Sequence, residues 1–346
     1  MSTSLCRFKP QAVMAVPTRS ATKENFMSSL RFLLIVFTVV LSLPALAQYP
    51  TKPIKIVVPY PPGGSTDVVA RLIGQKLQET WKQPVVVENR AGASGMIGTD
   101  IVAKSAPDGY TLLLAASGPQ AVNISLFPKI PYDPIKDFAP ITLVVSLPLL
   151  MVAPTSLPAN NAREFIAWAR DNKDKANYCS IGPGTPSHLA GELFKSMTGA
   201  DVAHIPYKGS GPALIDTMGG VCSVLFDSAL SSGPHVKSGK LKVLATGSKA
   251  RLGSWPDVPT LAESGLPGYE AYTWGALVAP AGTPRDIVAR LQAEVSRILA
   301  LPDVKQKLEA QGAIPEGGSS EQLATFIQAE IGKWAKVIKD GNIKAD

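Results

Sequence analysis

The chain has 346 residues, of which 45% are hydrophobic and 18% charged, so it holds enough apolar material for one large core or two smaller ones. Its formal charge is +7, but residues 1–47 hold five basic side chains and one acidic one, so the remaining 299 residues carry only +3. That excess is too small to indicate binding to nucleic acid or to an anionic membrane surface.

Residues 31–47 have the pattern of a secretory signal peptide. Arg31 ends a short positive stretch, residues 32–43 are apolar, and Ala45 and Ala47 place small side chains at positions −3 and −1 of a cleavage site. An apolar run of about a dozen residues is too short to span a bilayer. We therefore expect cleavage after Ala47 and an exported, soluble product. Either Met27 is the functional start, which we favour, or the leader is extended.

The rest of the chain alternates predicted strands and helices in two series. Strands of the first series are expected at residues 54–58, 85–87 and 111–116, with helices at 66–81 and up to about 102. Strands of the second series are expected at 178–181, 202–206, 221–227 and 241–246, with helices near 162–172 and 187–197 and between the later strands. Three helices follow at 284–299, 304–311 and 320–339, with Thr283 and Ser320 as expected caps.

Two long apolar extended segments, residues 141–152 and 272–278, bracket the second series. If both cross between lobes, they form a two-strand hinge. We therefore predict an α/β, two-lobed, type II-like periplasmic-binding-protein fold, in which each lobe is a mostly parallel sheet flanked by helices. The expected boundaries are a leader at 1–47, a first lobe of 48–145 plus 275–346, and a second lobe of 146–274.

Two cysteines, Cys179 and Cys222, lie beyond the leader in apolar, strand-like segments. In an oxidising compartment they could pair if the two strands are neighbours. The alternative, which we favour, is two buried thiols that pack as small apolar side chains. Neither cysteine has the spacing of a metal ligand.

Four strand-to-helix junctions are built alike, from glycine, proline and hydroxyl residues. They lie at residues 59–67, 182–188, 207–212 and 226–229. Ser65 or Thr66 is the expected cap of the first helix, and Thr185 the cap of another. Helix N-termini bind carboxylate or phosphate through free N–H groups, and in parallel sheets such junctions meet at one edge. These loops lack arginine and contain one cation, Lys208, so carboxylate is favoured over phosphate.

Each junction taken alone is also ordinary helix capping, and the similar loop at 92–95 is interpreted as structural. The three histidines have no zinc-ligand spacing, and no nucleophile elbow or P-loop occurs, so we expect no catalytic site, no metal and no cofactor. Asp227 either accepts a hydrogen bond from a ligand amino or hydroxyl group or simply caps a strand end. His188 is either a ligand donor or a hydrogen-bonded structural group.

The ordered motifs resemble the Bug-type substrate-binding proteins of tripartite tricarboxylate transporters. The matching segments are residues 49–54, 58–67, 87–95, 107–111, 188–194, 206–209, 257–260 and 263–268. The likeness covers nearly the whole chain after the leader. It implies a periplasmic protein whose lobes close on a small carboxylate, held mainly by backbone amides and bridging waters. Cys179 and Cys222 depart from the pattern, as does Pro183-Gly184 in a loop that is usually richer in serine.

The junction loops predict a ligand site, and the family resemblance implies that the segment 117–123 also belongs to it. The candidate residues are Tyr60, Pro61, Gly63, Gly64, Ser65, Thr66, Asp67, Ser117, Asn123, Gly182, Gly184, Thr185, Ser187, His188, Gly209, Ser210, Phe226, Asp227 and Ala229. The expected partners are a small carboxylate and, transiently, the membrane permease subunits of the transporter, with the protein itself a monomer. Two other functions stay open: delivery of the ligand signal to a sensor, and an exported enzyme that acts on a small acid.

Overall fold

The computed structural model describes residues 49–340 and 343–344, so the predicted leader, its start at Met27 and its cleavage after Ala47 lie outside the described residues. The strands are β1 (Ile54–Val58), β2 (Val85–Asn89), β3 (Thr111–Ala116), β4 (Phe138–Pro154), β5 (Asn177–Ser180), β6 (Ala203–Pro206), β7 (Val224–Ser228), β8 (Leu241–Thr246), β9 (Tyr272–Pro280) and β10 (Ile314–Gly317).

The helices are α2 (Ser65–Trp81), α3 (Met96–Ala103), α4 (Asn123–Leu126), α5 (Ala162–Asp171), α6 (Pro186–Thr198), α7 (Ser210–Met218), α8 (Ala229–Lys237), α9 (Arg285–Leu299), α10 (Pro302–Glu309) and α11 (Ser320–Asp340). Two short turns, η1 (Ala93–Gly95) and η2 (Gly118–Val122), complete the described elements.

The strands form one curled sheet in the order β2-β1-β3-β9-β4-β7-β5-β6, with β8 and β10 also paired to β4. The strands β1, β2 and β3 run parallel, as do β5, β6 and β7. The strands β9 and β4 run antiparallel to their neighbours, because each returns the chain between the two series. The predicted α/β, two-lobed class is confirmed, with mixed rather than mostly parallel sheets.

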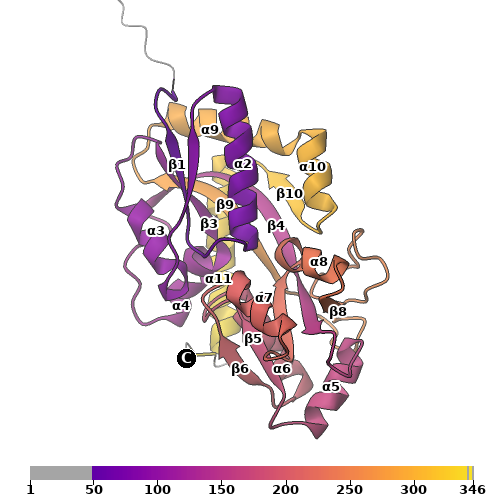
Figure 1. The fold of residues 1–346 in the computed structure, drawn as a ribbon. Helices are drawn as coiled ribbons and strands as arrows, with labels where there is room; N and C mark the ends of the chain where they lie inside the picture. The colour runs from indigo at the N-terminus through magenta and orange to yellow at the C-terminus, as the bar shows by residue number, and fades with distance from the viewer. Residues whose placement is uncertain (1–48, 341–342, 345–346) are drawn as a thin grey trace, which may run out of the picture. The chain divides into compact units, whose positions relative to one another are not determined.

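The long strand β4 belongs to both lobes (Figure 1). It pairs with β9 as far as Pro148, and with β7 from Leu149 onward. A second crossing lies beside it, where the N–H of Leu149 donates to the carbonyl of Ala271 at 3.1 Å. Two adjacent extended segments therefore join the lobes, as a hinge requires. The exact boundaries of the two lobes stay a prediction.

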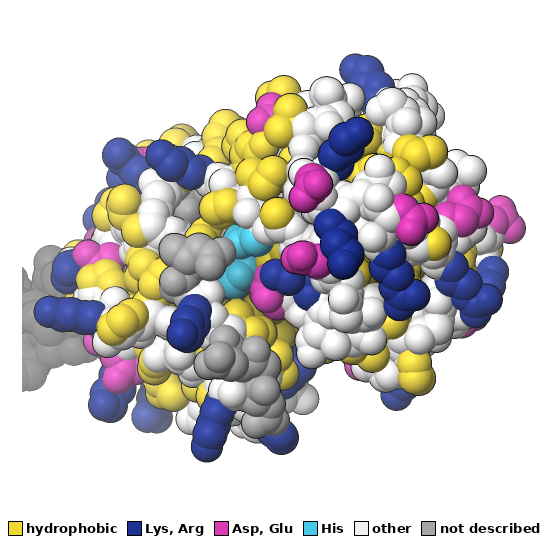
Figure 2. All heavy atoms as spheres, turned by 90° about the horizontal axis from the view of Figure 1, so that it is seen from below, with side chains coloured by type: hydrophobic (Ala, Val, Ile, Leu, Met, Phe, Trp, Pro, Cys, Tyr) yellow, Lys and Arg dark blue, Asp and Glu magenta, His cyan; other side chains and the backbone are white. Residues whose placement is uncertain are grey.

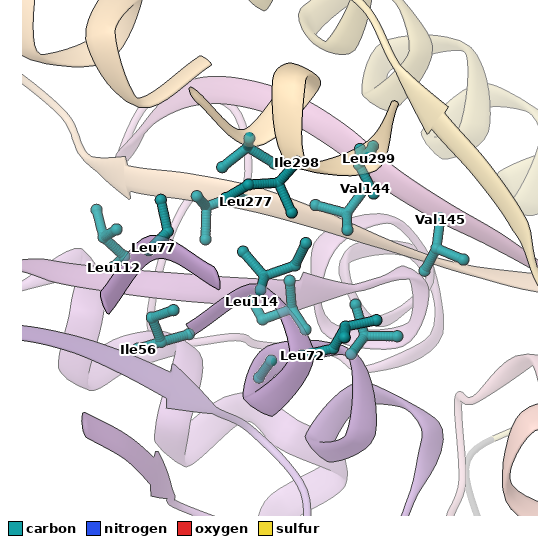
Figure 3. Packing of buried hydrophobic residues seen from close by; sticks show 14 of the residues in the cluster. Ile56, Leu72, Leu77, Leu112, Leu114, Val144, Val145, Leu277, Ile298 and Leu299 are labelled. Carbon is teal, nitrogen blue, oxygen red and sulfur yellow. The ribbon is translucent and has the colours of Figure 1, made fainter. Parts of the chain in front are cut away.

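Alternate residues of the strands pack into different cores, because successive side chains of a strand point to opposite faces. Ile56 of β1 packs with Leu72 of α2 and Ile298 of α9, on one face of the first lobe's sheet (Figure 3). Its neighbour Val57 packs on the other face, in a core shared with α11. The second lobe is layered in the same way, with α5 and α6 on one face and α7 and α8 on the other.

Cys179 and Cys222 form a disulfide with a Cα–Cα distance of 5.7 Å, so the favoured interpretation of two free buried thiols was wrong. The strands β5 and β7 pair directly, and Cys222 lies in the segment just before β7, where its Cα comes within 5.7 Å of the Cα of Cys179. The two strands were the neighbours that pairing requires.

Three expected helix caps were wrong in detail. Helix α2 begins at Ser65 and its N-cap is Gly64, so neither Ser65 nor Thr66 is the cap. Asp67, in the first turn, accepts a hydrogen bond from the backbone N–H of Gly63. Thr283 donates to the carbonyl of Pro280, which leaves Pro284 as the cap of α9.

At α11 the cap is Ser319 rather than the predicted Ser320. The Oγ of Ser319 accepts from the N–H of Gln322 at 3.2 Å, and Gln322 Oε1 accepts from the N–H of Ser319 at 2.7 Å. This reciprocal pair is a capping box. The hydroxyl of Ser320 donates to the carbonyl of Ile141 instead, which ties α11 to β4.

Candidate functional site

The loops after the strands of the two lobes meet across a cleft. A Cβ atom placed on Gly184 of the second lobe would lie 2.6 Å from Asn123 Oδ1 of the first. One placed on Gly209 would lie 2.7 Å from the Cδ of Pro61. Contacts this close show that the lobes are closed on each other, with glycines where the backbones approach.

A small cavity of about 20 Å³, here called the inner cavity, lies deep in this cleft. Both lobes and both hinge segments contribute to its wall. The predicted residues in the wall are Tyr60, Ser65, Thr66, Ser117, Ser187 and Asp227. The unpredicted ones are Ala116, Leu149, Ile181, Pro186 and Thr273. A volume of this size holds one water-sized group.

A second cavity of about 200 Å³, here called the outer cavity, adjoins the inner one, since Tyr60 and Ile181 line both. Its walls are the loop at residues 92–95 of the first lobe and the segments 181–183 and 207–208 of the second. The sequence interpretation of the 92–95 loop as purely structural therefore missed a part of the cleft. Its glycines gave it the same composition as the other junctions, but composition alone does not tell which loop faces the cleft.

Asp227 is the carboxylate of the inner cavity. It lies one residue before the end of β7, is 2% exposed, and accepts hydrogen bonds from Ser210 Oγ at 2.9 Å and Ser231 Oγ at 2.6 Å. Burial raises the pKa of Asp227 from 3.8 to about 6, although the hydrogen bonds from Ser231 and Ser210 act against this rise. The side chain therefore joins the starts of α7 and α8 and still faces the cavity.

Asp67 is placed differently, although it lies in a junction of the same kind. Its carboxylate accepts from the backbone N–H of Gly63 and from Asn89 Nδ2, each at 3.0 Å, and forms an ion pair with Arg71 at 2.9 Å. Burial acts to raise the pKa of Asp67, but the hydrogen bonds from Arg71, Gly63 and Asn89 outweigh it and hold the pKa below 3.8. These bonds hold the loop after β1 in place. Asp67 therefore shapes the cleft by positioning the backbone of this loop.

The loop at residues 182–188 is shaped from within. Thr185 caps α6, as predicted: its Oγ1 accepts from the N–H of His188 at 3.4 Å and donates to the carbonyl of Gly182 at 2.7 Å. The hydroxyl of Ser187 donates to the carbonyl of Phe226, which joins this loop to the end of β7. The ring of His188 accepts from the N–H of Gly184 at 3.3 Å and stacks on His204, with ring centroids 4.5 Å apart.

Figure 2 shows histidine atoms at the surface near acidic and basic side chains. A pocket of about 430 Å³ is lined by the buried His188 and by His204, together with Glu192 and Lys195. His188 is absent from the walls of both cleft cavities. Its position favours the structural one of the two roles that the sequence left open.

The predicted site residues thus divide by position. Seven line the two cavities, namely Tyr60, Ser65, Thr66, Ser117, Gly182, Ser187 and Asp227. Others make the contacts between the lobes or support the loops from behind: Pro61, Gly63, Gly64, Asp67, Asn123, Gly184, Thr185, His188, Gly209, Ser210, Phe226 and Ala229. Which of them bind a ligand stays a prediction.

The electrostatics of the cleft are simple. In the part of the chain that the structure describes, neither cavity wall contains arginine or histidine, and Lys208 is the one cation.

The same described residues bring together no group of three histidine, cysteine or acidic side chains that could hold a metal ion. None of their helices combines the length and apolar character needed to cross a bilayer.

Two α/β lobes on a two-strand hinge, closed over a cavity of backbone, hydroxyl and carboxylate groups, define a ligand-binding protein of the periplasmic class. Residues 69–343 match the family described as "Tripartite tricarboxylate transporter family receptor". The chain therefore belongs to this receptor family, and the resemblance drawn from the sequence motifs is confirmed.

Individual relatives agree with this assignment. Protein BugT of Bordetella pertussis is 42% identical over 297 residues, which cover 86% of this chain and 91% of that protein. A solved Rhodopseudomonas palustris protein with adipate is 37% identical with a TM-score of 0.83, and the match covers 86% of this chain and 99% of that one. MatC of the same organism, with bound malate, is 36% identical with a TM-score of 0.79, over 84% and 100% of the two chains.

Proposed function

We propose that this protein captures a small carboxylate in the cleft between its lobes and delivers it to the membrane permease of a tripartite tricarboxylate-type transporter. The inner and outer cavities carry this proposal. Each is lined by loops from both lobes, so a ligand there makes contacts in the closed form that the open form lacks. Closure then reports ligand capture to a partner.

The chemistry of the walls supports an organic acid. Hydroxyl groups, glycine-rich backbone and the single cation Lys208 suit one or two carboxylates, whereas tightly held phosphate usually calls for arginine. The relatives solved with adipate and with malate have ligands of this class. The family is one of binding receptors, and the part of the cavity walls that the structure describes holds no paired nucleophile and base, so we propose binding without catalysis.

A thermal-shift screen tests the proposal. The protein is purified from the periplasm, unfolded and refolded to remove any bound ligand, and heated with a panel of mono-, di- and tricarboxylates and their neutral amides. A ligand at about one hundred times its dissociation constant stabilises the folded state by about 2.7 kcal/mol. We expect a shift with one class of acid and none with its amides. Equal shifts with acids and amides, or no shift with any acid, would contradict the proposal.

A further inference from the structure

Resting on the proposed function, we propose that the ligand is an amino carboxylate: its protonated amino group binds Asp227 in the inner cavity, and its carboxylate lies in the outer cavity near Lys208. The proposal names a substrate class and assigns opposite roles to the two charged groups of the cleft.

Among residues 49–340 and 343–344, Asp227 has no cationic partner. Its carboxylate accepts from two uncharged hydroxyls, those of Ser210 and Ser231, and the described walls of the inner cavity contain no lysine, arginine or histidine. With a pKa of about 6, the group is mostly ionised at pH 7. A buried carboxylate needs a compensating charge to offset its loss of hydration. An ammonium group from the ligand supplies one.

The groups that face Asp227 are uncharged on every packed element. Leu150 of β4 lies opposite it in the sheet, Ser210 begins α7, and Ser231 lies in α8. Ser65 and Thr66 of α2 and Ser187 of α6 complete the wall around the cavity. Among the described residues that line the inner cavity, Asp227 is therefore the one that changes its charge in this pH range.

The size of the inner cavity points the same way. Its volume of about 20 Å³ suits one water-sized group, and an ammonium group has about that size. A carboxylate has three heavy atoms and would bring a second negative charge against Asp227, where neither could be fully ionised. The carboxylate of the ligand therefore fits the outer cavity, which has about 200 Å³.

The outer cavity has the opposite character. Lys208 contributes to its wall and forms no ion pair within the described part of the chain. The glycine-containing loops at 92–95 and 182–183 face it from the two lobes. Backbone N–H groups and one lysine form a suitable environment for an anion. A ligand that reaches past Tyr60 and Ile181 contacts both cavities.

Calorimetric titration with matched ligands tests this inference. Aspartate, malate and succinate share a carbon skeleton but carry an amino group, a hydroxyl group or neither; glutamate, 2-hydroxyglutarate and glutarate form a longer set. In one of the two sets, we expect the amino acid (aspartate or glutamate) to bind at least 10-fold more tightly than the hydroxy acid and the plain dicarboxylate of the same set. Asp227→Asn should remove that preference, whereas Asp171→Asn, the same charge change on exposed α5, should keep it.

A second arm needs no variant. Between pH 7.5 and pH 5 the affinity of wild-type protein for the amino acid should fall about 10-fold, because Asp227 takes up a proton that ligand binding must remove. Tighter binding of the plain dicarboxylate than of the amino acid, or an affinity for the amino acid that rises as the pH falls, would overturn the inference and leave carboxylate capture standing. Failure of every acid to bind would overturn both.

Discussion

The carboxamide of Asn123 and the backbone of Gly184 face each other across the cleft: a Cβ atom on Gly184 would lie 2.6 Å from Asn123 Oδ1 and 3.0 Å from the side chain of Leu126. Real Cβ atoms do not approach other atoms so closely, so the closed form needs a residue without a side chain here. This Asn123 oxygen is buried and has no hydrogen-bond partner among the described residues. Close contact between the lobes therefore requires glycine, the residue without a Cβ atom, at position 184.

Gly184→Ala should hold the lobes apart and weaken ligand binding at least 10-fold. Calorimetry with the ligand found by screening measures the effect. Gly184 has φ +73, so the variant also strains the backbone, and a matched control is needed. Gly199→Ala provides it, because Gly199 has φ +65 and no atom within 4 Å of the added Cβ. Equal affinities for the two variants would show that contact at position 184 does not govern closure.

Asp227 should make the ligand-free protein less stable as the pH rises. Its pKa is about 6 in the folded state against 3.8 in the unfolded chain, so only the folded protein holds this proton between those values. The stabilisation is present below about pH 4 and is lost as the pH rises through 6. Relative to Asp227→Asn, the free energy of unfolding of wild type should fall by at most about 3 kcal/mol across this range. Urea unfolding of both proteins at pH 4, 5, 6 and 7 measures it; a constant difference would refute it.

Glu330 of α11 is a buried carboxylate with a structural role. It is 4% exposed, and its Oε2 accepts from the indole N–H groups of Trp274 and Trp334 at 3.0 Å each, while Oε1 accepts from the hydroxyl of Tyr272 at 2.8 Å. Glu330→Ala leaves the two indole donors unsatisfied and should cost about 3–5 kcal/mol of stability.

The measurement is urea unfolding at pH 7, with Gln328→Ala as the control on the exposed face of the same helix. That variant should stay within about 0.5 kcal/mol of wild type. Glu330→Gln should fall between the two, because the amide keeps one acceptor oxygen. A loss with Glu330→Ala no larger than that with Gln328→Ala would mean that the two indoles find other acceptors.

The disulfide between Cys179 and Cys222 should stabilise the folded protein. It closes a loop across a sequence separation of 43 residues, and cross-links of this length restrict the unfolded chain by about 2–4 kcal/mol. We expect the double variant Cys179→Ala, Cys222→Ala to have a free energy of unfolding that is lower by that amount, as measured by urea unfolding. Ligand binding should be retained. Two free thiols titrated in the protein as purified from the periplasm would contradict the pairing.

Much of the fold could be predicted, because apolar periodicity marks strands and helices locally. The bounds of β1, β3 and β8 agree with the predicted ranges. β10 was missed, because Pro315 and Gly317 hide a four-residue strand whose pairing depends on β4. The direction of β9 and the neighbouring positions of β5 and β7 depend on long-range pairing, which local pattern does not encode.

The site could be predicted only as a set of loops. Gly64 and Asp227 both lie in strand-to-helix junctions, but their sequence contexts do not tell which one faces the other lobe and which one faces a cavity. The loop at 92–95 differs from the other junctions in carrying Ala93 and Ser94 at positive φ, a backbone feature that the sequence does not announce. Ile181 also lines both cavities, but its apolar, branched side chain at the end of a predicted strand suggests an ordinary core residue.

Hydrogen exchange with and without the carboxylate found by screening tests most directly whether ligand is captured between the lobes. We expect added protection in loops of both lobes, at residues 60–67, 92–95 and 117–123 of the first and 181–188 and 207–210 of the second, with the outer helices α5 and α10 unchanged. Protection confined to one lobe, or centred on the histidine pocket outside the cleft, would contradict capture between the lobes.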